Sequence, residues 1–232
     1  MNNDLKNLLK EFCDKYSLEY YNDVLLIVVE DISEYVRKDD LQYYSDKKEA
    51  LNDIYGLLYE DSSGNWNILL KDQDKVNFYM TLIHEYVHFG DYKKLSNWRK
   101  NTNLRELEND FVFLFWTEFH ATYMSYKELI GLAPKKIDIK SCQSNLVADL
   151  VKYCSFPQLD VNKLLNNTCR SYGQYWALHD AFPLDVPLYP RQYYLDKTFL
   201  DIYKFLGDNK SFDNFVSNYC EFEKLLQGLN GK

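Results

Sequence analysis

Apolar side chains recur at every third or fourth position over much of the chain, a spacing typical of amphipathic helices. The pattern predicts helices over residues 3–16, 145–153, 161–181, 197–206 and 212–226. A further stretch, residues 104–132, is aromatic over most of its middle and stops at Ala133-Pro134. We therefore expect one long buried helix there, ended by the proline.

Shorter apolar runs in the first third of the chain predict strands. Residues 24–29 form a mostly β-branched run, which is typical of a buried strand. Residues 54–59 and 66–70 flank the turn-rich segment 61–65 and together predict a β-hairpin. The expected fold class is α+β and predominantly helical, with a small, mostly antiparallel sheet and a helical C-terminal part.

Another helix is expected directly after the hairpin. Its apolar positions are Val76, Tyr79, Met80, Ile83 and Val87. Asp72 or Asp74 is suited to cap its start, because an aspartate side chain can accept the first backbone N–H groups of a helix. Gly90 is expected to end or loosen it.

Two of the four histidines of the chain lie in this helix, as His84-Glu85-Tyr86-Val87-His88. Side chains four residues apart share one face of a helix, so His84 and His88 can bind one metal ion. Glu85 projects about 100° away, where it can reach a metal-bound water without being a ligand. The motif predicts a hydrolytic zinc site. The alternative is a surface helix with two polar histidines.

Catalytic zinc usually takes a third protein ligand and leaves one position to water. The best candidate is Glu118, because a carboxylate within an aromatic helix is costly unless it is paired or binds a metal. Glu106 and Glu108 are rivals, but they lie in a charged opening turn with Asp110 that is expected to be solvated. A buried structural carboxylate is the alternative role for Glu118.

Three further residues are considered for the site. His120 competes as a ligand, but it lies two residues from Glu118 and so projects from another side of the helix. Asp91 could accept the ring N–H of a ligand histidine, as such sites commonly need, or be solvated after the helix end. His179 could stabilise an oxyanion, or it could simply suit the negative end of a helix.

Composition narrows the class of protein. The chain has 232 residues, 46% of them hydrophobic and 17% aromatic, which is typical of a folded globular protein. A net charge of −8 argues against nucleic-acid and anionic-membrane partners. No apolar segment follows basic residues at the N-terminus, so no signal peptide is expected. Five scattered cysteines without a C-x-x-C pair favour reduced thiols in the cytoplasm.

The domain organisation is expected to be one compact unit in two parts. Residues 1–132 would form the metal-binding core, and residues 133–232 would pack on it as a helical C-terminal region. The proline-rich segment 182–190 reads as a connector between helices. The oligomeric state is not indicated by any pattern in the chain.

Residues 50–125 resemble a known family. A hairpin, a His84-Glu85-x-x-His88 helix and a helix with Glu118-Phe119-x-Ala121 among aromatic residues are similar to the minimal gluzincins of the ImmA/IrrE type. These are small cytoplasmic zinc metallopeptidases, often encoded on phages and other mobile elements. One departure is Tyr86-Val87, where a small or aliphatic residue followed by glycine would be expected.

The resemblance implies a zincin-like fold, with His84, His88 and Glu118 as zinc ligands and Glu85 as general base. By analogy, the substrate would be an intracellular protein such as a repressor-like regulator. The expected function is thus zinc-dependent hydrolysis of peptide bonds, as an endopeptidase, through a metal-activated water. The alternatives are a zinc-binding regulatory or interaction module without proteolytic turnover, and a helical protein with a chance motif.

Overall fold

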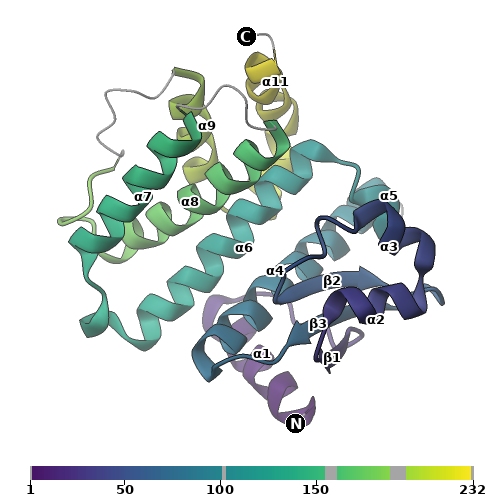
Figure 1. The fold of residues 1–232 in the computed structure, drawn as a ribbon. Coiled ribbons are helices and arrows are strands. Elements are labelled where there is room, and N and C mark those ends of the chain that lie inside the picture. Colours follow the sequence, from purple (N-terminus) through teal and green to yellow (C-terminus); the bar gives the residue numbers. More distant parts are fainter. Residues whose placement is uncertain (1, 101–102, 155–160, 189–196, 231–232) are drawn as a thin grey trace. The chain divides into compact units, whose positions relative to one another are not determined.

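The computed structural model describes residues 2–100, 103–154, 161–188 and 197–230 (Figure 1). As expected, the fold is α+β and mostly helical. Contacts within the chain divide it into two compact units, Met1–Asn109 and Asp110–Lys232. This division differs from the expected one after residue 132, because the helix over residues 111–132 packs mainly on a later helix.

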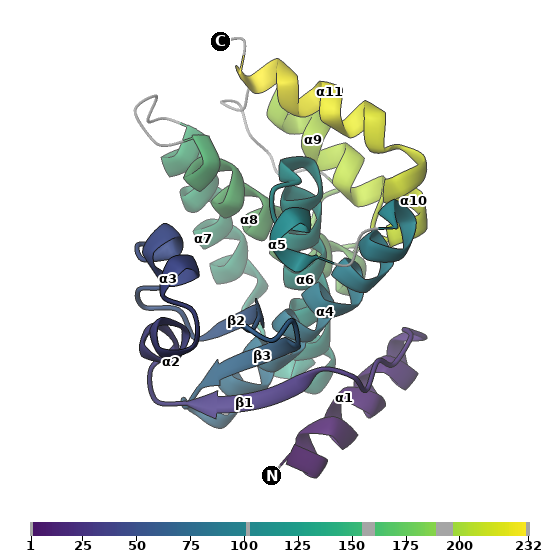
Figure 2. The ribbon, with the colours of Figure 1, turned by 90° about the vertical axis from the view of Figure 1, so that its right-hand side faces the viewer.

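The first unit contains a three-stranded sheet whose spatial order is β1-β3-β2 (Figure 2). The strands are β1 (Leu25–Val29), β2 (Gly56–Glu60) and β3 (Trp66–Lys71). Strands β2 and β3 are antiparallel, which confirms the predicted hairpin. Strand β1 pairs with β3 in parallel, so the sheet is mixed. A parallel pair needs a long connection, and residues 30–65, which include β2, supply it.

The helices of the first unit are α1 (Asn2–Tyr16), α2 (Ile32–Asp39), α3 (Leu41–Lys47), α4 (Lys75–Arg99) and α5 (Leu104–Leu107). Successive side chains of a strand point to opposite faces of the sheet. Tyr59 and Leu69 join the core cluster with Ile32 of α2. On the other face, Trp66 contacts Phe89 of α4, with ring centroids 5.6 Å apart. Both faces are therefore covered, which explains the nearly continuous apolar runs of the strands.

Helix α4 carries the histidine pair. The side chain of Asp74 caps its start by accepting hydrogen bonds from the N–H groups of Val76 and Asn77. The expectation that Gly90 ends or loosens the helix is wrong, since α4 continues for nine more residues to Arg99. A glycine inside a helix costs only about 1 kcal/mol. Burial of the residues around it, including Phe89, outweighs that cost.

The expected single helix over residues 104–132 is interrupted. Helix α5 ends at Leu107, and α6 (Phe111–Leu132) begins after Asp110, whose side chain accepts a hydrogen bond of 3.0 Å from the N–H of Phe113. Asp110 is buried, so the prediction that this residue is solvated is wrong. Glu106 is exposed, as predicted. An aspartate that can cap a new helix competes with continuation of the old one.

The second unit is helical throughout its described residues. Its elements are α6, the 3-10 turn Pro134–Lys136, α7 (Ile139–Cys154), α8 (Val161–Ala181), α9 (Lys197–Asp208), α10 (Phe212–Ser217) and α11 (Tyr219–Asn230). Helices α6 and α8 pack side by side over most of their length (Figure 1). The end of the proline-rich connector, residues 189–190, lies outside the described residues.

The expected helix over residues 212–226 is also split, at Asn218. The side-chain amide of Asn218 donates hydrogen bonds to Oδ1 of Asn209 and to the carbonyl of Asn214. These bonds give the chain an alternative to helical pairing at that position.

The structure bears on two further expectations. In the part of the chain that the structure describes, Cys13, Cys142 and Cys220 are reduced thiols, as expected for scattered cysteines. Among the described residues, no helix combines the length and the apolar character needed to cross a membrane.

Candidate metal centre

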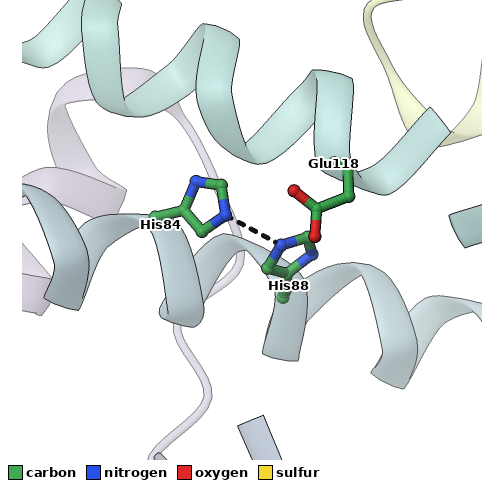
Figure 3. Close-up of side chains that lie close together, drawn as sticks. All are labelled: His84, His88 and Glu118. Atoms are coloured by element: carbon green, nitrogen blue, oxygen red, sulfur yellow. Dashed lines mark hydrogen bonds between the residues drawn. The ribbon is translucent and has the colours of Figure 1, made fainter. Parts of the chain in front are cut away.

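His84 and His88 form a close pair on α4. Their Nε2 atoms lie 3.0 Å apart, and the two rings are nearly perpendicular at 83° (Figure 3). The pair follows from helix geometry, because residues four apart stand one above the other. The two imidazoles thus present their outer nitrogens to the same point.

Glu118 belongs to the same group of possible ligands. One nitrogen from each histidine and one carboxylate oxygen of Glu118 all lie within 4.8 Å of one another, so these residues could hold a metal ion (Figure 3). Ligand atoms around a tetrahedral zinc ion lie about 3.3 Å from each other. The spacing of the two imidazoles fits such an ion, and two histidines with one carboxylate form a donor set that zinc accepts.

Glu85 lies against the sheet. Its Oε2 atom accepts a hydrogen bond of 3.0 Å from the backbone N–H of Leu58 in β2. The close approach depends on Gly56, because a Cβ atom there would lie 2.5 Å from Cγ2 of Thr81 and 2.7 Å from Cγ of Glu85. The sequence marks Gly56 only as a glycine inside a strand, which often signals close approach of another group.

The Leu58 N–H lies on the side of β2 that faces away from β3. The carbonyl of Tyr55 accepts from the N–H of Lys71, so Tyr55 faces β3. Backbone groups alternate between the two sides of an antiparallel strand, and Leu58 therefore faces the other way. Since β2 is last in the strand order, no described strand covers this side. The carboxylate of Glu85 thus lies at a sheet edge.

Tyr86 lies inside the His-Glu-x-x-His motif and contacts the segment before β1. Its hydroxyl accepts a hydrogen bond of 2.8 Å from the N–H of Tyr21 and donates one of 3.0 Å to the carbonyl of Tyr21. Burial raises the pKa of Tyr86, which keeps the hydroxyl protonated and able to donate. Tyr86 therefore holds the segment between α1 and β1 against α4.

Sequence reasoning missed Arg170 of α8. Its Nε atom lies 2.8 Å from Oε2 of Glu118, forming an ion pair within the second unit. The two residues are 52 positions apart, and only the packing of α8 on α6 brings them together. No motif in the chain indicates this pair.

Asp91 and His120 are both buried. Asp91 lies inside α4, so the expectation of a solvated residue after the helix end is wrong. The pKa of Tyr21 is raised, mainly by burial and by Glu19, and the charge of Asp91 adds to this. His120 stacks on Trp116, with ring centroids 4.9 Å apart. The group of possible ligands found among the described residues includes neither of them.

His179 lies in the last turn of α8. Its Nδ1 atom is 3.5 Å from Oδ1 of Asp180, and its ring meets the edge of Trp176. It does not belong to the group of possible metal ligands among the described residues.

No family model, no curated protein and no solved structure matches the chain.

Proposed function

We propose that this protein is a zinc-dependent peptidase of the minimal gluzincin kind, with a zincin-like arrangement of its first unit. His84, His88 and Glu118 would bind the zinc ion, and Glu85 would act as general base. The observation that carries the proposal is the group of two imidazoles and one carboxylate, with a second acidic residue, Glu85, beside it on α4.

A zinc ion held by His84, His88 and Glu118 would supply Lewis-acid chemistry, namely polarisation of the scissile carbonyl and activation of a water molecule. Glu85 takes the proton of the attacking water and delivers it to the leaving amine. The hydrogen bond from Leu58 orients this carboxylate. Gly56 leaves the space that the Glu85 side chain occupies beside β2.

The sheet edge beside Glu85 supports a substrate in extended form. An extended peptide can add to an exposed strand through backbone hydrogen bonds. Bound along β2, its backbone would lie next to the general base, since the Leu58 N–H and the Glu85 carboxylate are in contact. The proposed substrate class is a protein segment without regular structure. Its identity as a repressor-like regulator in the cytoplasm rests on the family resemblance alone.

The test combines metal analysis with cleavage of an unbiased peptide library followed by mass spectrometry. Glu85→Gln should retain one zinc per chain but lose at least about 100-fold in cleavage rate, because it removes the proton acceptor. His84→Ala should lose zinc and cleavage together. Glu11→Gln makes the same change on an exposed face of α1 and should leave both unchanged.

Two outcomes would contradict the proposal. Full cleavage by Glu85→Gln would remove the general base from the mechanism. A wild-type protein that holds zinc but cleaves no peptide would favour the binding module without turnover.

A further inference from the structure

Arg170 contacts the carboxylate that is proposed as the third metal ligand. Its Nε–H donates to Oε2 of Glu118 over 2.8 Å. The side chain of Glu118 is 18% exposed, whereas that of Arg170 is 53% exposed. The pair thus joins a largely buried carboxylate to a guanidinium that remains partly in water. Both residues belong to the second unit.

The backbones of α6 and α8 are unusually close one helical turn from this pair. Gly173 lies three residues after Arg170, and a Cβ atom there would be 2.7 Å from the carbonyl oxygen of Phe119 and 2.9 Å from Cβ of Thr122. Residues three apart share a helix face. Gly173 therefore brings the Arg170 face of α8 against the turn of α6 that carries Glu118.

The buried thiol of Cys169, next to Arg170 in α8, experiences the charges of both Glu118 and Arg170. This thiol is fully buried, and its pKa is raised by that burial and further by the charge of Glu118, while Arg170 lowers it. The charged carboxylate and the guanidinium thus both act on the same buried atom of α8.

We propose, on the basis of the proposed zinc site, that Arg170 is a positioning residue that holds Glu118 in the conformation that binds the metal. A free glutamate side chain has many rotamers, and ordering it on metal binding costs affinity. A hydrogen bond from the planar guanidinium selects one rotamer in advance. Carboxylate ligands in metal sites commonly have such a hydrogen-bonded partner.

The positive charge of Arg170 also has an effect that opposes metal binding, because it repels a divalent cation and competes with it for the carboxylate. Because half of the guanidinium side chain is exposed, water and salt screen this repulsion. The ordering of Glu118 is a local effect that solvent does not screen, so it should outweigh the repulsion. The net consequence is tighter metal binding.

The experiment measures the dissociation constant of zinc by competition with a chromophoric chelator. Arg170→Met should weaken zinc binding about 10- to 100-fold, the range found when partners of metal ligands are removed. Arg170→Lys should recover part of the loss, because an ammonium retains a donor but lacks the planar geometry. Arg37→Met, at an exposed arginine of α2, removes the same charge and should leave the affinity unchanged.

The outcomes separate this inference from the function it rests on. If the wild type binds zinc and both Arg170 variants bind it within about twofold of wild type or more tightly, the positioning role is wrong and the zinc site stands. If the wild type binds no zinc, the proposed function fails as well. Thermal unfolding of the metal-free variants shows that they are folded. If Arg170→Met does not fold, the comparison of Arg170→Lys with the wild type decides the question.

Discussion

At the residue scale, the candidate site depends on small side chains as much as on charged ones. Glu85 reaches its hydrogen bond with Leu58 only because position 56 has no side chain. A motif search finds the glutamate but not the glycine, since the two are far apart in sequence and meet only when β2 lies on α4. The position of Glu85, the proposed general base, is thus a property of the packed unit.

Gly56→Ala should displace Glu85. The added methyl group would overlap Thr81 and Glu85, which should destabilise the fold by about 1–3 kcal/mol. A shift of the base by about 1 Å should lower the cleavage rate by up to about 100-fold. Gly90→Ala is the control on the neighbouring helix. Its new atom would lie 3.8 Å from Tyr21, in ordinary contact, and it should be neutral or slightly stabilising. Equal effects of the two variants in urea unfolding and activity would contradict the role of Gly56.

Asp180 should make stability depend on pH. Burial opposes ionisation of its carboxylate, but hydrogen bonds from Lys210 and Tyr123 outweigh this and lower the pKa of Asp180 below its ordinary 3.8. A lowered pKa means that the folded state binds the proton less well than the unfolded state. The stabilisation is therefore complete above that ordinary pKa and is lost as the pH falls through the lowered value.

Asp180→Asn should consequently cost about 1–2 kcal/mol of unfolding free energy at pH 7. The difference from wild type should shrink below about pH 3.8. Urea unfolding over this range measures it, with Asp208→Asn, at an exposed aspartate of α9, as the control. A difference that stays constant with pH would show that the charge of Asp180 is not the cause.

At the element scale, three predicted helices needed correction, and each correction has a local cause. Helix α4 continues through Gly90 because buried residues on both sides hold it in place. The interruption before α6 and the break between α10 and α11 occur where Asp110 and Asn218 offer side-chain hydrogen bonds to the backbone. Apolar spacing alone predicts where helices run, but not where a cap divides them.

The α6–α8 pair depends on Gly173. Gly173→Ala would place a methyl group 2.7 Å from a backbone oxygen of α6, which cannot move independently of its helix. We expect a loss of about 1–3 kcal/mol in the free energy of unfolding. Gly228→Ala in α11 is the matched control, because its nearest neighbouring atom would be 3.9 Å away. Thermal or urea unfolding of the two variants measures this loss. An unchanged stability of Gly173→Ala would mean that the two helices can separate slightly at no cost.

At the scale of the whole molecule, the proposed zinc ion has three protein ligands, His84, His88 and Glu118. A ligand that binds only the folded chain stabilises it by mass action. Zinc should therefore contribute to the stability of the protein as a whole and not only to its chemistry.

Removal of zinc by a chelator should lower the unfolding temperature. At a free zinc concentration about 100 times the dissociation constant, the stabilisation is about 2.7 kcal/mol, or about 5–10 °C for a chain of this size. His88→Ala should unfold at the same temperature with and without chelator, whereas Glu85→Gln should still respond to it. A wild-type unfolding temperature that does not change with chelator would contradict a zinc site that couples to folding.

Patterns in the sequence predict the α+β class, the hairpin, the helix with its histidine pair and the acidic residues that could complete a metal site. These follow from local periodicity and from the four-residue spacing of a helix, which need no distant partner. The tertiary structure alone decided the parallel pairing of β1, the contact of Glu85 with the edge of β2 and the ion pair of Glu118 with Arg170. Such contacts join residues far apart in the chain, and the local pattern of the sequence does not predict them.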